Sequence, residues 1–107
     1  MFIAMNRFKV ASGKEAQFEQ TWRDRTSYLQ GVPGFVRFAL LRGDQPGDYI
    51  SHSTWTDRDA FIAWTKSESF VAGHRQGGSL MGVLEGPPVV ALYDAVIEEH
   101  ATEPAAT

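Results

Sequence analysis

The chain has 107 residues, of which 43% are apolar and 21% are charged, a composition typical of one globular domain with a thin core. Its net charge of −3 lacks the basic footprint of a nucleic-acid-binding protein, and the absence of cysteine excludes disulfides, thiolate nucleophiles and cysteine-ligated metals. No apolar run reaches the ~20 residues of a membrane helix, and the start of the chain lacks a signal-peptide pattern. We therefore expect a cytoplasmic protein with no nucleic-acid or membrane partner.

The first thirty residues predict a strand followed by a helix. Residues 2–10 alternate, and Asn6 is the one polar side chain on the otherwise apolar even-numbered face. The sequence Ser12-Gly13-Lys14-Glu15 has the form of a capping box, which predicts a helix over residues 13–30. This helix should bury three large side chains, Phe18, Trp22 and Leu29.

A hairpin and a second helix are expected next. Residues 35–42 and 49–55 predict two strands joined by the turn-rich sequence GDQPGD. The sequence Thr56-Asp57-Arg58-Asp59 resembles another capping box and should open a helix. One side of that helix is apolar and carries Ala60, Phe61 and Trp64.

The second helix should break at residues 67–69, because Ser67-Glu68-Ser69 offers a new N-cap with an acidic first turn. A short helix with His74 near its end follows, and the glycine-rich residues 73–88 predict a mobile connection. We expect a last strand over residues 89–97 and a disordered polar tail over residues 98–107.

The order of these elements predicts an α+β fold of the ferredoxin-like type, βαββαβ, in which two helices cover one face of an antiparallel sheet. The strands at 35–42 and 89–97 carry apolar side chains on both faces. Because the helices can cover only one face, the other must meet another chain or stay exposed. A homodimer is therefore expected, formed through whichever face the helices leave open.

Three residues are candidates for chemistry, and each has a structural alternative. His74 is either an iron ligand or a cation favoured by a helix C-terminus, and spacing alone favours the second. Asn6 is either a donor to a bound ligand or an amide satisfied by nearby backbone, and the pattern leaves both open. Trp64 taken alone is more often core than ligand contact. In one continuous helix, Trp64 and His74 would point apart, so the predicted break is what allows them to face a common cavity.

The other histidines are weaker candidates. His52 lies on a predicted strand and is expected to be a satisfied sheet histidine, and His100 lies in the tail. The three histidines lack the spacing of a zinc or non-haem iron site. The glycines near residue 77 do not follow a strand and open a helix, so they predict no phosphate-binding loop.

Four sequence features together resemble a known family. They are Asn6-Arg7-Phe8, the Pro33-Gly34-Phe35 turn, Trp55, and the pattern Phe61-x-x-Trp64-x₅-Phe70-x₃-His74. This set resembles the antibiotic-biosynthesis-monooxygenase (ABM) superfamily and, within it, the IsdG-like haem-degrading monooxygenases. The resemblance extends from about residue 2 to residue 97, which we take as an ABM-type domain. The turn and Trp55 indicate the fold, whereas Asn6, Trp64 and His74 in combination point to haem.

The resemblance implies a dimeric α+β barrel with one haem in each subunit. His74 then corresponds to the proximal iron ligand, Trp64 to the residue that presses on the macrocycle, and Asn6 to the distal hydrogen-bond donor. Haem would be both cofactor and substrate, opened by O₂ with release of iron. Because the sequence has no flavin or nicotinamide motif, the electrons would come from an external reductase or a small reductant.

Two other functions remain open. The first is a cofactor-independent ABM-type monooxygenase that acts on an aromatic polyketide or quinol. In that case Asn6 and Trp64 would line the substrate pocket, and His74 would be incidental or a base. The second is a non-catalytic dimer that binds haem and only sequesters it.

Overall fold

The structure is a computed structural model that describes residues 1–76 and 82–101, with the side chains of 73–76 outside the described part. Its elements, in chain order, are β1 (Phe2–Lys9), α1 (Glu15–Asp24), β2 (Phe35–Arg42), β3 (Asp48–Trp55), α2 (Arg58–Thr65), α3 (Glu68–Gln76) and β4 (Val89–Asp94). The four strands form one antiparallel sheet in the order β2-β3-β1-β4. The ferredoxin-like α+β prediction is therefore confirmed.

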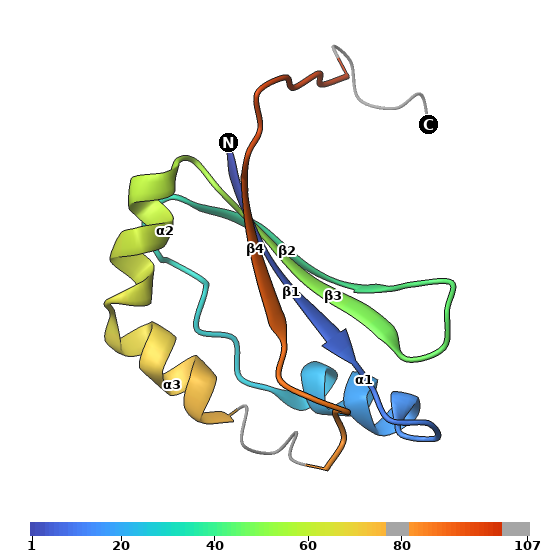
Figure 1. Ribbon diagram of the computed structural model, residues 1–107. Coiled ribbons are helices and arrows are strands. Elements are labelled where there is room, and N and C mark those ends of the chain that lie inside the picture. The colour runs from blue at the N-terminus through green and yellow to red at the C-terminus, as the bar shows by residue number, and fades with distance from the viewer. Residues whose placement is uncertain (77–81, 102–107) are drawn as a thin grey trace.

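The helices lie on one side of the sheet, where they cover the even-numbered face of β1 (Figure 1). Two apolar clusters form the core on this side. The first contains Phe8, Val10, Phe18, Tyr49 and Val83. The second contains Phe2, Ala4, Leu29 and Trp55. Trp22 packs against the first cluster and Trp64 against the second, so the core is divided along the length of β1.

Helix α1 is shorter than predicted. It begins at Glu15 after Lys14, whose side chain forms no capping bond, so the predicted capping box is absent. Gly13 instead adopts a left-handed φ of 81°, within a turn closed by the Lys14 N–H and the Ala11 carbonyl at 2.9 Å.

The same helix ends at Asp24, and Arg25 is already extended. Thr26 and Ser27 are poor helix formers because their hydroxyls compete for backbone partners, and the Ser27 hydroxyl accepts the Leu29 N–H at 3.4 Å. Leu29 is buried as predicted, but it reaches the core from an irregular segment.

The predicted break between the second and third helices is confirmed. Helix α2 ends at Thr65 and α3 begins at Glu68. The Ser67 hydroxyl accepts the Phe70 N–H at 3.2 Å and donates to the Trp64 carbonyl at 2.6 Å, so one side chain ends one helix and caps the next. At the start of α2 the cap is Asp57, whose carboxylate accepts the Ala60 N–H at 2.8 Å.

A bulge in β2 corrects the predicted assignment of its faces. Simple alternation places Phe35 with Ala39 and Leu41, but the register shifts between Phe35 and Arg37. Phe35, Phe38 and Leu40 consequently face the helices, and Leu41 faces the opposite side.

The opposite side of the sheet, which we name the open face, is not covered by a helix. By strand register its side chains are Ile3, Met5, Arg7, Lys9, Arg37, Ala39, Leu41, Asp48, Ile50, His52, Thr54, Val89, Ala91 and Tyr93. Tyr93 and Val89 are 53% and 65% exposed, which agrees with the predicted apolar surface. Strand β4 ends at Asp94, earlier than predicted, and Val96 and Ile97 are exposed.

Two further observations concern the C-terminal residues and the length of the helices. Residues 102–107 lie outside the described part, so the disordered tail and the domain limit at residue 97 stay predictions. Among the described residues, no helix is long and apolar enough to cross a membrane.

Candidate functional site

Asn6 lies on the helix-covered face of β1, between the two apolar clusters. Its neighbours across the sheet are Ser51 on β3 and Val90 on β4. Ser51 is 5% exposed, so a polar band interrupts the core at this point. None of the side-chain hydrogen bonds among the described residues involves the Asn6 amide. Backbone satisfaction of this amide, one of the two alternatives, therefore finds no support.

The sheet beside Asn6 is incompletely covered. Val90 and Leu92 of β4 lie on the same face as Asn6, yet they are 62% and 39% exposed. Apolar side chains on a helix-covered face are normally buried. We name Asn6, Val90 and Leu92 the β4 strip: one amide beside two uncovered apolar side chains. Such a surface suits a flat, largely apolar ligand that accepts a hydrogen bond.

Trp64 belongs to the aromatic core between α2 and the sheet. Its ring lies 5.2 Å from that of Trp55 and 6.1 Å from that of Phe61. Phe70 of α3 meets it edge-on at 4.9 Å and 86°, which ties the two short helices together. The packing role weighed for Trp64 is confirmed. Contact between Trp64 and a ligand stays a prediction.

His74 lies in α3, one helical turn after Phe70, and its side chain is outside the described part. Its role as an iron ligand therefore stays a prediction. Asn6 and Trp64 do share one side of the sheet, because Ala4, two residues from Asn6, belongs to the cluster on which Trp64 packs. Within residues 1–76 and 82–101, no group of three or more His, Asp or Glu side chains could hold a metal ion.

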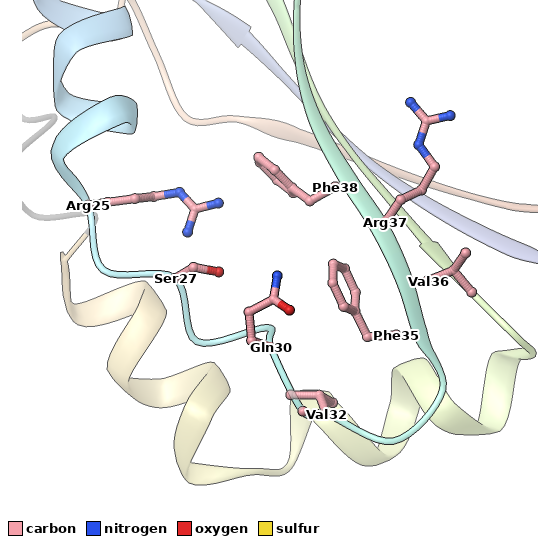
Figure 2. Close-up of a pocket in the computed structure, with 9 residues that line it drawn as sticks. Arg25, Ser27, Gln30, Val32, Phe35, Val36, Arg37 and Phe38 are labelled. Carbon is pink, nitrogen blue, oxygen red and sulfur yellow. The ribbon is translucent and has the colours of Figure 1, made fainter.

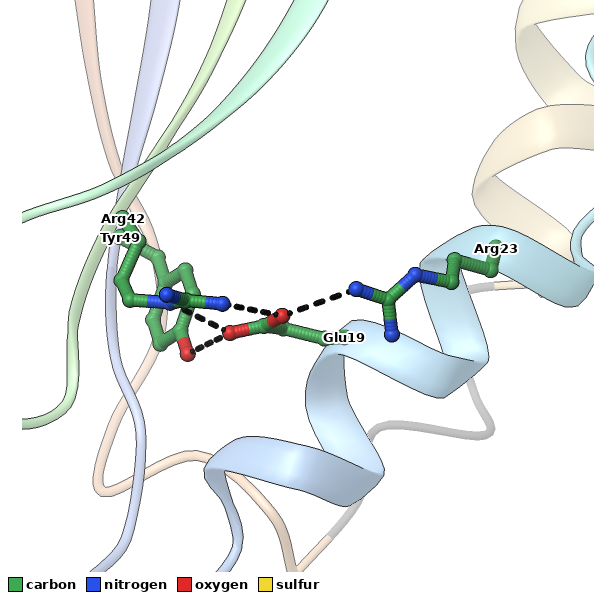
Figure 3. A network of polar contacts seen from close by, with 4 residues as sticks. All are labelled: Glu19, Arg23, Arg42 and Tyr49. Carbon is green, nitrogen blue, oxygen red and sulfur yellow. Dashed lines mark hydrogen bonds and ion pairs between the residues drawn. The ribbon is translucent and has the colours of Figure 1, made fainter.

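A polar network joins α1 to the sheet (Figure 3). The Glu19 carboxylate accepts two hydrogen bonds from Arg42 at 2.7 Å, one from the Tyr49 hydroxyl at 2.5 Å, and one from Arg23 at 3.2 Å. Arg42 and then Tyr49 hold the pKa of Glu19 at about 2, and Glu19 in turn raises the pKa of Arg42. Burial, more than the bond to Glu19, raises the pKa of Tyr49.

Because Glu19 stays ionised near neutral pH, it can accept hydrogen bonds but cannot act as an acid. The sequence analysis missed this network. Only the Glu19–Arg23 pair, with its i,i+4 spacing, leaves a signal in the sequence. The contacts with Arg42 and Tyr49 depend on the fold.

The structure also has hollows that the sequence analysis did not predict. One of about 550 Å³ lies between β2 and the segment after α1, and Figure 2 shows its lining. Another of about 350 Å³ lies between α1 and β2. Arg25 and Phe38 line both hollows, whereas Asn6 and Trp64 line neither.

His52 was predicted to be a sheet histidine whose ring nitrogens are hydrogen-bonded, and the structure differs from this prediction. It lies on the open face, between Met5 and Ala39 in the strand register. Its Nδ1 atom is buried and has no hydrogen-bond partner among the described residues. The nitrogen is buried without a polar partner in the described part of the chain. The alternation of residue types along the strand could not predict this missing partner.

Comparisons with known proteins find relatives in sequence and in structure. Deoxynogalonate monooxygenase from Streptomyces nogalater is 41% identical over 58 residues, which are 53% of this chain and about half (48%) of that protein. Heme oxygenase (mycobilin-producing) from Mycobacterium tuberculosis is 30% identical over 78 residues, covering 68% of this chain and 72% of that protein. The structure of the heme-degrader MhuD from M. tuberculosis has a TM-score of 0.72 and 21% identity, covering 94% of this chain and all of that one.

Residues 1–76 match the sequence model of the family described as antibiotic biosynthesis monooxygenase. This match includes Asn6, the turn at Pro33-Gly34-Phe35, Trp64 and the position of His74. The predicted resemblance and the monooxygenase class are thereby confirmed. The chain belongs to the antibiotic biosynthesis monooxygenase family.

Proposed function

We propose that this monooxygenase degrades haem, which serves as both cofactor and substrate. The observation that carries the proposal is the β4 strip, where the Asn6 amide has no partner among the described residues and lies beside the uncovered Val90 and Leu92. Its composition fits a macrocycle, because most of a porphyrin is flat and apolar. When bound, haem supplies a redox-active iron and the ring that is oxidised.

Each candidate residue has a distinct task in this proposal. His74, as a neutral imidazole on α3, would hold the iron. Asn6 donates a hydrogen bond from its amide without ever releasing a proton. Trp64 is backed by Trp55 and Phe70, so its ring can press on a ligand without yielding. Apolar surroundings also exclude water from the reacting atoms.

The proposal includes partners. The open face of one copy packs against that of a second copy, which makes the enzyme a homodimer. We place this homodimer in the cytoplasm. O₂ and an external electron donor, either a reductase or a small reductant, complete the reaction. Support for the homodimer comes from the exposed Leu41, Val89 and Tyr93 on this face.

A second function is cofactor-independent oxygenation of an aromatic polyketide. It is favoured by the 41% identity with deoxynogalonate monooxygenase over 58 residues. The β4 strip would then hold an aromatic substrate, with Asn6 donating to one of its oxygens. His74 would not be a ligand.

Titration with haemin tests the proposal. We expect a shifted Soret band that needs His74 but not His52, so His74→Ala should lose the shift and the matched variant His52→Ala should keep it. Addition of ascorbate in air, with catalase present to remove free peroxide, should bleach the band. A stable Soret complex that does not bleach indicates a non-catalytic haem-binding protein. Absence of any Soret shift contradicts haem as the ligand and favours the aromatic substrate.

A further inference from the structure

A partly buried hydroxyl contacts the tryptophan rings at the α2 end of the core. Ser53 belongs to β3 and faces the helices, two residues before Trp55 on the same face of the strand. Its hydroxyl accepts the Trp55 indole N–H at 3.0 Å and donates to the Ala4 carbonyl of β1 at 3.4 Å. One side chain therefore connects the strand that carries Asn6 with the indole that contacts Trp64.

The bond to Ser53 gives the Trp55 ring a defined orientation. Trp55 is fully buried, so solvent does not reach its indole N–H. Phe35 and Phe61 meet the ring edge-on, with 5.5 Å and 5.8 Å between centres. Contacts between rings are less directional than an N–H···O bond, which requires the indole nitrogen to face the hydroxyl. The bond therefore adds direction to the packing.

Trp22, at the other end of the core, differs in this respect. Its Nε1 atom is buried and has no hydrogen-bond partner among the described residues, and its ring is stacked on Phe38 with planes 20° apart. A buried N–H without an acceptor costs free energy, and the folded chain accepts this cost at Trp22. The acceptor at Ser53 therefore points to a requirement for position, beyond packing, in the indole that contacts Trp64.

The Trp55 ring supports the ring of Trp64. Their centres lie 5.2 Å apart with planes 34° apart, and Phe70 meets Trp64 edge-on at 4.9 Å. Trp64 is only half-buried, so part of its ring stays accessible. Because protein cores are closely packed, a rotation of Trp55 displaces the ring that rests on it. The position of the accessible part of Trp64 therefore depends on Trp55.

We propose that Ser53 is a positioning residue, which fixes the Trp55 ring and, through it, the ring that Trp64 presents to the ligand. The inference rests on the proposed function, in which Trp64 presses on the haem. Ser53 does not touch the ligand and acts only through Trp55. A displacement of about 1 Å caused by a change away from the reacting atoms can cost about a hundredfold in rate. Ser53 should therefore influence turnover more than binding.

Nuclear magnetic resonance of the full chain without ligand tests the positioning directly. We expect Overhauser contacts between the indole rings of Trp55 and Trp64 in the wild type. Ser53→Ala removes the acceptor, so it should lose these contacts and shift the Trp55 indole resonance. Ser53→Thr keeps the hydroxyl on a side chain that suits a strand, and it should retain both. Glu19→Gln is the matched control, because it alters the α1 end and should leave the Trp55 resonance unchanged.

Titration with haemin then tests the consequence for the site. Ser53→Ala should bind haem within about threefold of the wild-type affinity, but its Soret band should bleach about tenfold to hundredfold more slowly with ascorbate. Ser53→Thr should bleach within about twofold of the wild-type rate. A wild type that binds no haem contradicts the proposed function, and the ring contacts of the ligand-free chain then decide on Ser53 alone.

Two outcomes would overturn the inference. One is a Ser53→Ala chain that keeps the contacts between Trp55 and Trp64, which would show that packing alone fixes the rings. The other is a lower melting temperature with an unchanged bleaching rate per bound haem, which would make the bond purely structural. If Ser53→Ala fails to fold by circular dichroism, Ser53→Cys keeps a similar size but is a weak acceptor. It should also slow bleaching, and a rate equal to that of the wild type would contradict the positioning role.

Discussion

The helix layer is joined to the sheet by rings and a charged network at α1, and mainly by rings at α2 and α3. At the α1 end, Phe18 is fully buried between Phe8 and Tyr49, and Glu19 forms a network with two arginines and a tyrosine. At the other end, ring contacts and one exposed ion pair, Arg58–Asp94 at 3.3 Å, hold α2. There β4 keeps uncovered apolar side chains on the covered face.

This difference indicates that the two ends of the thin core have different roles, one in stability and the other in ligand binding. The α1 end supplies stability, because its rings and charges already satisfy one another. The α2 and α3 end leaves both an amide and apolar area unsatisfied, which is what a ligand can complete. Variants of the unsatisfied Asn6 amide should therefore change activity, and variants of the Glu19 network should change stability.

Asn6→Ala should have the largest effect and should act on turnover. Removing one donor positioned toward charge that develops during oxidation typically costs about 10²–10³ in rate. The free energy of unfolding should change by less than about 1 kcal/mol, because no described partner loses a bond. Soret position and haem affinity should stay close to wild type. Bleaching rates and melting temperatures from one preparation decide the matter, and a destabilised but fully active variant contradicts the assignment.

Leu41→Asp should act on assembly. Leu41 is 43% exposed on the open face, so a carboxylate there is tolerated by the folded monomer but is buried unpaired in the proposed dimer. We expect dimerisation to weaken by about a hundredfold, seen as a folded monomer by sedimentation at micromolar concentration.

The neighbouring position provides the control. Leu40 packs against the first apolar cluster, so Leu40→Asp should prevent folding and not only assembly. A wild-type monomer, or a Leu41→Asp dimer as stable as the wild type, would refute the interface.

These two leucines also show how far the sequence could predict the structure. Alternation in residues 35–42 identifies the strand correctly but assigns its faces wrongly at one end. The cause is a β-bulge, which adds one residue to the strand and which no residue type in this segment predicts. Within residues 1–76 and 82–101, periodicity located the four strands, and a capping signal located the helix break at Ser67.

The candidate site was predictable to a lesser degree. Asn6 could be found because one amide on an apolar strand face is anomalous by itself. The Glu19 network and the Arg25 hollow join residues that are distant in the sequence, so only the fold reveals them. The burial of the His52 nitrogen has the same cause.

Glu19→Gln should alter the dependence of stability on pH. The pKa of Glu19 is about 2 in the folded chain and 4.5 ordinarily, so folding favours the ionised form. Its contribution is complete above about pH 4.5 and is lost as the pH falls toward about 2. Wild type should therefore melt at a higher temperature than Glu19→Gln at pH 7, and the two curves should converge in acid. Parallel curves would show that the network adds no pH-dependent stability.

Asp57→Ala should have the smallest effect, and it tests the α2 end of the helix layer. The Asp57 carboxylate accepts the Ala60 N–H at 2.8 Å, and loss of such a cap typically costs about 1 kcal/mol, or roughly 4 °C in melting temperature for a chain of this size. Asp59→Ala is the matched control, because Asp59 also lies in the first turn but does not cap the helix. Since α2 carries Trp64, the proposed haem contact, haem affinity should fall in Asp57→Ala together with stability. If the melting temperature falls but haem affinity does not, the position of α2 does not affect haem binding. The proposal that the α2 end serves ligand binding is then contradicted.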